Sequence, residues 1–276
     1  MPNVGDQKLK PTVKPVRRGQ EERAQAQQAA VQAASGTAAQ GERIASGIPG
    51  LDELLGGGFE PASTTLVMGG AGCGKTTLLA QYLFVGAAQY GDPGVLLTFE
   101  ESSESVFKHM LNFGFDFKAL EEQNLFATIN YRPHKVKKLV EEGGGLIMDT
   151  VSSLGAKRLC IDSLTSYMTL FETAYQAREA EISLFDLLRK WGCTTLLSAE
   201  GRLSDKDRRT TGLEYLSDGV IVMHHPRNQS MRYRAIEVLK MRGGKPTEKL
   251  CPFEFVDNVG LKIYPNEAIF YDLKDE

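Results

Sequence analysis

The residues with the clearest chemical meaning lie at positions 69–76, which read Gly-Gly-Ala-Gly-Cys-Gly-Lys-Thr. This run fits the phosphate-loop pattern G-x-x-x-x-G-K-[ST], and it lies between an apolar run typical of a strand and a stretch typical of a helix. Glycines allow successive backbone N–H groups to point at one phosphate, and the following helix N-terminus adds its dipole. We therefore predict that the loop binds nucleotide phosphates. The predicted contacts are Gly69, Gly70, Ala71, Gly72, Cys73, Gly74, Lys75, Thr76 and Thr77.

A magnesium site next to such a loop also needs an acidic group, which the loop itself does not contain. Asp162 ends the apolar run 158–161, where its carboxylate can hold a magnesium-bound water. The Thr76 hydroxyl is the other predicted ligand for Mg²⁺. An apolar run that ends in Asp is common, and alone it indicates only a solvated strand end. The phosphate loop is the reason to assign Asp162 to the metal.

Two adjacent glutamates, Glu100 and Glu101, directly follow the apolar run 95–99. A water that attacks a γ-phosphate needs a carboxylate that orients it and accepts its proton. Because successive strand residues face opposite ways, one of the two can aim at the water while the other forms local hydrogen bonds. We predict that the pair activates the water, with Glu100 as the base. The alternative is that the two glutamates are a charged pair at the start of a loop, with no role in catalysis.

Lys240 and Arg242 form a pair of cations at the end of a late predicted strand. Strand alternation places them on one face and Met241 on the other. Such a pair suits a γ-phosphate, and its distance in sequence from Lys75 indicates a phosphate held by a neighbouring subunit, as with an arginine finger in trans. From the residues alone, an exposed basic strand end is an equally good interpretation.

The elements that must position these residues alternate between strand and helix. The predicted strands are short, apolar on both faces and bounded by glycine or charge, which is typical of a buried parallel sheet. These strands are 64–68, 95–99, 125–131, 158–162, 194–198 and 220–224, and the helices are 75–90, 104–112, 145–154 and 173–191. After a turn at 226–230, antiparallel strands at 232–240 and 253–264 extend the sheet. The pattern predicts a doubly wound α/β fold with a mostly parallel central sheet flanked by helices.

Composition sets wider bounds on the chain. Its 276 residues, 42% of them hydrophobic, allow one large domain or two small ones, and the net charge of −3 lacks the basic footprint of a dedicated duplex-binding protein. Apolar runs are too short to span a bilayer, and the N-terminus has no secretory h-region. The four cysteines lie far apart, so we expect reduced thiols. We predict a cytoplasmic protein that does not enter a membrane.

The first 41 residues differ from the rest of the chain. Residues 1–20 carry five basic residues against one acidic residue, and 13 of the 17 residues at 24–40 are Ala or Gln. This composition offers little to bury, so we predict a disordered tail at 1–41. We expect the tail to bind an unidentified protein partner or to act as a solvated extension. Residues 42–276 are predicted to form a single domain.

Several motifs together resemble those of KaiC-type ATPases, in the RecA/RadA superfamily of P-loop proteins. They are the run 44–58, the phosphate loop, Thr98-Phe99-Glu100-Glu101, Ile161-Asp162-Ser163, and the runs 214–218 and 239–243. The similarity covers about residues 42–272, which corresponds to one KaiC-like domain. It implies a RecA-like fold, a homo-oligomer in the form of a hexameric ring, and ATP and Mg²⁺ between protomers.

The resemblance also implies roles for individual residues. It makes Lys240 and Arg242 contacts to the γ-phosphate of the neighbouring protomer, and it makes Asn112, which precedes a Phe-Gly pair, and Asp257 contacts to the nucleotide. The circadian clock ATPase of this family autophosphorylates a Ser-Thr pair. At the corresponding place this chain has Glu214-Tyr215. That departure disfavours autophosphorylation at this place.

Three functions fit the sequence. We favour a regulatory, ATP-hydrolysing ring. The second is a RadA-like recombinase paralogue that binds single-stranded DNA through the basic clusters at 202–209 and 135–138, although two aspartates interrupt the first cluster and it has no aromatic residue to stack a base. The third is an autokinase or a signalling scaffold that hydrolyses little ATP.

Overall fold

The structure is a computed structural model that describes residues 43–99, 101–131, 145–201, 212–228 and 231–267. The chain divides into two units, Met1–Gly41 and Glu42–Glu276, and the second is described here by itself. The predicted tail, Glu100 and the basic clusters at 202–209 and 135–138 lie outside the described residues.

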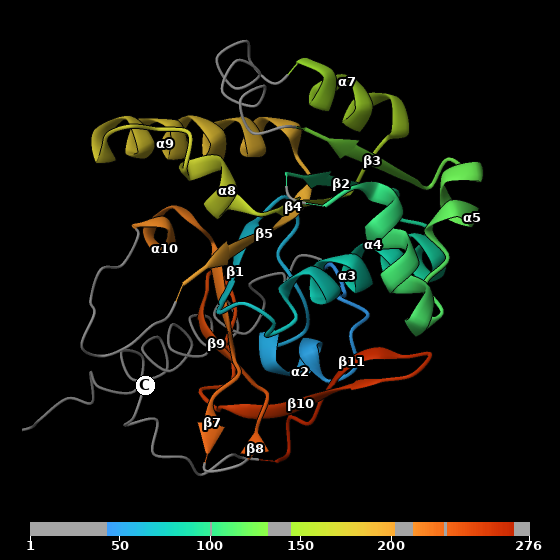
Figure 1. Cartoon of the computed structure of the whole chain (residues 1–276), viewed down its shortest axis with the longest axis vertical. Coiled ribbons are helices and arrows are strands. Elements are labelled where there is room, and N and C mark those ends of the chain that lie inside the picture. Colours follow the sequence, from blue (N-terminus) through green and yellow to red (C-terminus); the bar gives the residue numbers. More distant parts are fainter. Residues whose placement is uncertain (1–42, 100, 132–144, 202–211, 229–230, 268–276) are drawn as a thin grey trace, which may run out of the picture. The chain divides into compact units, whose positions relative to one another are not determined.

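A nine-stranded sheet organises the second unit, in the order β11-β10-β9-β6-β1-β5-β4-β2-β3. The strands from β6 to β3 in this order are parallel, whereas β9 is antiparallel to β6, and β10 is antiparallel to both β9 and β11. The bounds are β1 (Thr64–Gly69), β2 (Gly94–Thr98), β3 (Phe126–Asn130), β4 (Arg158–Asp162), β5 (Thr194–Glu200), β6 (Gly219–His224), β9 (Ala235–Met241), β10 (Cys251–Val256) and β11 (Gly260–Ile263). The predicted mostly parallel sheet with antiparallel strands at the C-terminal end is confirmed (Figure 1).

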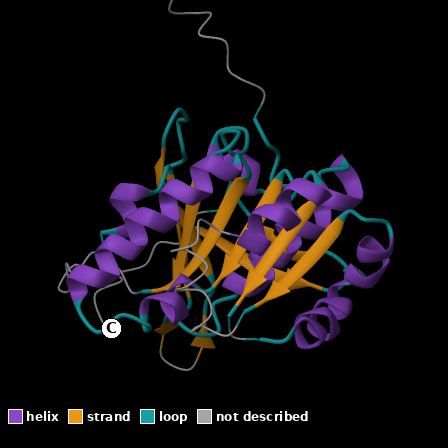
Figure 2. Ribbon diagram, turned by 90° about the horizontal axis from the view of Figure 1, so that it is seen from above, coloured by secondary structure: helices purple, strands orange, loops and turns teal. Residues whose placement is uncertain are grey.

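Helices cover both faces of this sheet, as Figure 2 shows. One face carries α2 (Leu51–Leu55), α3 (Lys75–Tyr90), α4 (Ser103–Met110) and α5 (Phe117–Glu122), and the other carries α7 (Gly145–Leu154), α8 (Leu164–Met168), α9 (Ala174–Trp191) and α10 (Leu213–Leu216). Strand residues alternate between the two apolar cores, so that Val67 joins the α3 side while Leu66 and Met68 join the α9 side. Among the described residues, no helix has the length and apolarity needed to cross a bilayer.

Local sequence explains where the helices begin and end. The Thr173 hydroxyl caps α9 by accepting a hydrogen bond from the Gln176 N–H at 3.2 Å, and Gly192, with φ of 70°, ends the same helix. The Ser102 hydroxyl caps α4, and the Ser163 hydroxyl caps α8 directly after β4. These caps set the positions of the helices that follow β2 and β4.

The C-terminal part differs from the prediction in one respect. The run 253–264, predicted as one strand, contains the hairpin of β10 and β11, because Asn258 in the turn and Gly260 at the start of β11 take left-handed backbone angles. Gln81 of α3 holds the hairpin: its side-chain amide donates to the carbonyl oxygens of Val259 and Leu261 and accepts from the Leu261 N–H. The hairpin is therefore fixed to the helix that follows the phosphate loop.

Several short elements were not predicted. The helices α2, α5, α8 and α10 have four to six residues each, too few to display a helical period. The two-residue strand β7 (Arg227–Asn228) lies within the predicted turn at 226–230, and its partner β8 (Met231–Arg232) directly follows that turn. A 3-10 turn, η1 (Leu111–Phe113), follows α4.

Candidate active site

The phosphate loop joins β1 to α3. Gly72 and Gly74 have φ of +73° and +107°, angles that side chains other than glycine rarely adopt. A Cβ at Gly74 would also lie 2.4 Å from the Phe255 ring, and one at Gly69 would lie 2.5 Å from the Met223 carbonyl oxygen. Gly72 therefore requires glycine for its backbone angle, Gly69 requires it for space, and Gly74 requires it for both. The loop therefore has the shape in which successive N–H groups can surround an anion.

Lys75 lies inside this loop. Its side chain is almost fully buried, and its ammonium group donates to the carbonyl oxygens of Gly69 at 2.8 Å and Gly70 at 3.1 Å. The charge is thus held over the loop at the N-terminus of α3, where the helix dipole also favours an anion. Among the other loop residues, Cys73 is buried, and burial raises the pKa of its thiol, so that it stays neutral. Ala71 and Gly72 are exposed at the rim.

The structure brings Thr76 and Asp162 together, although 86 residues separate them in sequence. The Thr76 hydroxyl donates to Asp162 Oδ2 at 2.7 Å, and the Ser198 hydroxyl donates to the other carboxylate oxygen, Oδ1. Because the Thr76 hydrogen points at Asp162, its oxygen lone pairs point elsewhere and can bind a cation. A hydroxyl oxygen and a carboxylate oxygen are ligands that suit Mg²⁺.

The Glu101 carboxylate makes its contacts with α4. It accepts a hydrogen bond from the Ser105 hydroxyl at 3.3 Å and lies 3.7 Å from Nδ1 of His109, and both partners belong to α4. This is the local bonding expected of one member of the glutamate pair. Glu100, the predicted base, lies outside the described residues.

Asn112 and Asp257 are exposed on two neighbouring loops, η1 and the turn between β10 and β11. The loops meet where Gly114 approaches Asn258, and the rings of Phe113 and Phe255 lie 5.9 Å apart. Since Phe255 also contacts the phosphate loop at Gly74, both predicted nucleotide contacts lie on loops that adjoin the phosphate loop.

Two residues that sequence reasoning missed also border the loop, Arg234 and Phe255. The Arg234 guanidinium lies over the Phe255 ring, 5.1 Å from its centroid, and its charge opposes the effect of burial on the pKa of Cys73. Arg234 Nε is buried and has no hydrogen-bond partner in the described part of the chain. Neither residue belongs to a motif near the loop in sequence, so no local pattern could have identified them. The sheet topology alone brings them there.

Lys240 and Arg242 lie elsewhere. The Lys240 ammonium donates to the carbonyl oxygens of Glu214 at 2.7 Å and Ser217 at 2.6 Å, and the Arg242 guanidinium pairs with Asp218 at 3.0 Å. Burial and the nearby charge of Arg242 lower the pKa of Lys240. Both predicted cations are therefore bound to α10 and the residues that follow it, and neither touches the phosphate loop of its own chain.

The register of the sheet explains this separation. Gly219 pairs with both Thr65 of β1 and Met241 of β9, so that Met241 lies near the start of β1 while the phosphate loop follows its end. At about 3.3 Å per residue, the length of β1 separates the two places by about 16 Å. The pairing also skips Leu239, a bulge that leaves Met241 in the α2–α5 core and turns Lys240 toward α10.

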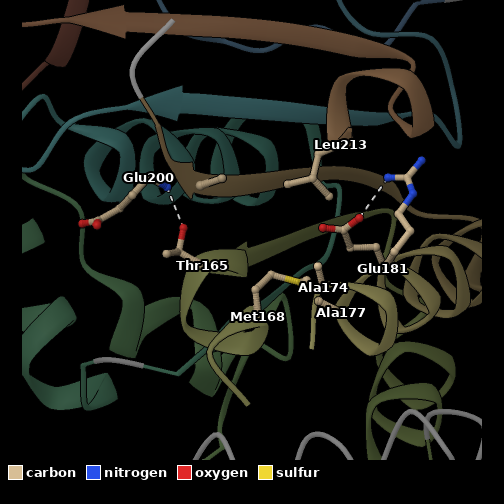
Figure 3. A pocket seen from close by; sticks show the side chains of 9 residues that line it. Thr165, Met168, Ala174, Ala177, Glu181, Glu200 and Leu213 are labelled. Carbon is tan, nitrogen blue, oxygen red and sulfur yellow. Dashed lines mark hydrogen bonds and ion pairs between the residues drawn. The ribbon is translucent and has the colours of Figure 1, made fainter. Parts of the chain in front are cut away.

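A cavity of about 350 Å³ lies on the other face of the sheet, between α8, α9 and the end of β5 (Figure 3). It is lined by Thr165, Met168, Ala174, Ala177, Arg178, Glu181, Ala199, Glu200 and Leu213. Arg178 and Glu181 form an ion pair at 2.9 Å on one wall, and the Glu200 N–H donates to the Thr165 hydroxyl on another. The mostly apolar wall contains no glycine loop, so the cavity is distinct from the candidate phosphate site.

A glycine loop between a parallel strand and a helix, a buried lysine, and a Thr-Asp pair from α3 and β4 define a P-loop nucleotide-binding protein of the RecA type. A family model described as "ATPase: KaiC" matches residues 44–268. The chain belongs to the KaiC ATPase family, and the resemblance inferred from the motifs is confirmed.

Individual known proteins are also similar to this chain over most of its length. A UPF0273 protein of Methanopyrus kandleri is 31% identical over 85% of this chain and 96% of its own length. Circadian clock protein KaiC2 of Synechocystis is 31% identical over 80% of this chain but only 39% of its own length. The crystal structure of a KaiC-like protein from Pyrococcus horikoshii OT3 superposes with a TM-score of 0.72 and 35% identity, covering 81% of this chain and 99% of that one. The chain is thus similar to single KaiC-like domains.

Proposed function

We propose that this protein binds ATP with Mg²⁺ and hydrolyses it, and that the nucleotide lies between copies of the chain in a ring. The observation that carries the proposal is the hydrogen bond from Thr76 to Asp162, next to Lys75 in a glycine loop. Loop N–H groups and an ammonium fit the phosphates, and the Thr76 and Asp162 oxygens fit the metal. The residues present therefore suit both ligands.

In this proposal the loop residues bind and orient the triphosphate. Lys75 exchanges its bonds to the Gly69 and Gly70 carbonyl oxygens for phosphate oxygens, and Thr76 and Asp162 hold Mg²⁺ directly and through water. When bound, Mg²⁺ neutralises charge on the β- and γ-phosphate oxygens. Arg234, Phe255, Asn112 and Asp257 supply contacts to the rest of the nucleotide. The full set spans the loop and the two loops beside it.

Hydrolysis requires a base, and we assign that role to Glu100. The Glu101 carboxylate contacts Ser105 and His109 of α4, and these contacts favour its neighbour Glu100 as the base. The water oxygen attacks the γ-phosphorus, the bond to the β-phosphate oxygen breaks, and the water proton passes to Glu100.

The distance between Lys75 in the phosphate loop and the Lys240–Arg242 pair supports an assembly of several copies of the chain. Lys240 and Arg242 lie at the end of β1 opposite to the phosphate loop, so they fit a phosphate bound to a second copy. A contact between unlike ends of identical chains is heterologous and closes into a ring when the rotation allows. We propose a hexameric ring in the cytoplasm, with a regulatory role and a tail at 1–41 that binds a protein partner.

The test is nucleotide binding by Lys75→Ala. Removing a buried cation from a phosphate site costs about 2–5 kcal/mol, and we expect titration calorimetry to show affinity for Mg²⁺–ATP reduced by at least about 30-fold. Lys190→Ala, which removes an exposed lysine at the end of α9, is the matched control and should bind as the wild type does. Unchanged affinity in Lys75→Ala would refute the assignment of the loop.

A further inference from the structure

Ser198 of β5 has a buried hydroxyl next to the Asp162 carboxylate of the candidate site. It is fully buried, and its position on β5 directly follows Leu197, which pairs with Ile161 of β4. Its hydroxyl donates to Asp162 Oδ1 and also lies 3.4 Å from the Ile161 carbonyl oxygen. Thr195 of β5 also has a buried hydroxyl, but it donates to the carbonyl oxygen of Cys193, which directly precedes the strand.

We propose that Ser198 is a positioning residue for the magnesium site. A carboxylate can rotate about its terminal bond and exchange its two oxygens, so a site that needs one defined oxygen must fix this rotation. Ser198 binds Oδ1 and Thr76 binds Oδ2, and together they set the plane of the Asp162 carboxylate. This role rests on the proposed function, because it concerns the same Mg²⁺.

The chain of hydrogen bonds joins three elements. Ser198 on β5 orients Asp162 on β4, and Asp162 in turn accepts the hydrogen of Thr76 on α3, which aims the Thr76 lone pairs toward the metal. Hydrogen bonds to a carboxylate are shorter and stronger than neutral ones, so each bond restricts rotation effectively. Ser198 thus acts on the metal through Asp162 and not by contact.

The end of β5 is itself held in place, so that Ser198 has little freedom to move. Two residues further on, the Glu200 N–H donates to the Thr165 hydroxyl of α8 at 2.7 Å, as Figure 3 shows. On its other side, β5 pairs with β1, where Val67 lies opposite Ser198. The hydroxyl is therefore presented from a strand that is fixed on both sides.

The experiment measures how nucleotide binding by the full chain depends on Mg²⁺. Fluorescent ADP is held at a fixed concentration while MgCl₂ is titrated, and binding in EDTA is measured separately. Loss of an outer partner of a metal ligand typically weakens metal affinity about 10–100-fold, and we expect Ser198→Ala to raise the half-saturating Mg²⁺ concentration by about tenfold. Binding in EDTA should stay within about twofold of wild type, because the loop is untouched.

Two further variants separate positioning from packing. Ser198→Thr keeps the hydroxyl and should restore most of the Mg²⁺ response, whereas Thr195→Val removes another buried hydroxyl from the same strand and should leave the response unchanged. If Ser198→Ala melts below the titration temperature, Ser198→Cys keeps the volume with a weaker donor and carries the same expectation.

A folded Ser198→Ala variant with the wild-type Mg²⁺ response overturns the inference while leaving the proposed function intact. An equal shift in Thr195→Val overturns it as well, because the effect would then come from the strand. If wild-type binding itself does not depend on Mg²⁺, both the proposed metal site and the role of Ser198 are wrong.

Discussion

The two ends of β1 carry different kinds of charged site. At the loop end, Lys75, Thr76 and Asp162 come from α3 and β4 and are bonded to the loop or to one another. At the other end, Lys240 of β9 and Arg242, which directly follows this strand, bind backbone oxygens and Asp218 near α10. Lys75 is 9% exposed, whereas the Arg242 side chain is 52% exposed. The loop end thus holds a buried cation beside a bonded Thr-Asp pair, and the far end holds an exposed guanidinium beside a partly buried ammonium.

The far end also shows an electrostatic imbalance. Burial lowers the pKa of Lys240, and the neighbouring charge of Arg242 lowers it further, which means that the folded protein disfavours the lysine charge relative to water. An anion placed between the two groups would reverse this effect. On the proposed function, the loop end would enclose phosphates, and the Lys240–Arg242 end would be stabilised by a phosphate placed beside it.

The largest expected effect concerns the far end. An arginine finger contributes about 10³–10⁵-fold to turnover in P-loop enzymes, so Arg242→Ala should lower ATP hydrolysis by about 10³-fold while its own intact loop still binds ATP. Phosphate release in steady state, together with calorimetry, measures both quantities. Wild-type turnover in this variant would remove the far end from the reaction.

Mixing two inactive variants sharpens the same comparison. Arg242→Ala has an intact loop and Lys75→Ala has an intact far end, so a heterologous interface between them contains both halves of a site. With random assembly, about one quarter of interfaces are complete, and turnover should recover to about a quarter of wild type. A mixture that stays inactive, despite light scattering that shows joint assembly, contradicts a shared site.

At the loop end, the two glutamates should differ. Removing a general base costs about 10²–10⁴-fold in rate, and we expect this loss for Glu100→Gln with ATP binding retained. Glu101→Gln should change turnover by less than about threefold, because the Glu101 carboxylate is bonded to α4. Equal losses in the two variants would show that the pair acts differently from this assignment.

A smaller effect is expected from the edge of the loop. Arg234→Ala removes the guanidinium over Phe255, and we expect nucleotide affinity to fall by about three- to tenfold, in line with a hydrogen bond or cation–π contact of about 1 kcal/mol. Arg232→Ala, which removes a neighbouring exposed arginine, is the control. Equal affinities for Arg234→Ala and wild type would separate this edge from the nucleotide.

The smallest effect is a pH dependence at the far end. Because the folded pKa of Lys240 lies below its ordinary value of 10.5, the unfolded chain binds more protons between these two values, and the free energy of unfolding rises with pH there. Lys240→Met lacks this contribution, so its stability should rise less than that of wild type on going to alkaline pH. Urea unfolding at several pH values compares the slopes, and identical slopes would contradict the expected pKa.

The loop end was largely predictable because its chemistry is local. The glycines, Lys75 and Thr76 lie within eight consecutive residues, and this loop is the reason why Asp162, at the end of an apolar run, could be assigned to the metal. Alternation along a strand also predicted that Lys240 and Arg242 share a face and that one glutamate bonds locally. The inferences about alternation use the geometry of a single strand, and the assignment of Asp162 adds one strand end to the loop motif.

The remaining features depend on contacts between distant segments. Phe255 and Arg234 meet the loop only because β10 and β9 follow β6 in the sheet. The bulge at Leu239 arises from pairing with Val220 and Ile221, and a strand read by itself has no signal for it. The short helices α2, α5, α8 and α10 gain their stability from packing on the sheet and not from their own sequence.

The position of β1 has a consequence for the order in which the protein is made. This strand lies between β5 and β6. Hydrogen bonds at its start join Ala62 to Thr194 and Thr64 to Asp218, which lie 132 and 154 residues further along the chain. Contacts of such separation form late, since much of the chain must be synthesised and ordered first. The phosphate loop therefore stays without its supporting strands until the ribosome has released most of the domain. On the proposed function, ATP would therefore stabilise only chains whose synthesis is complete.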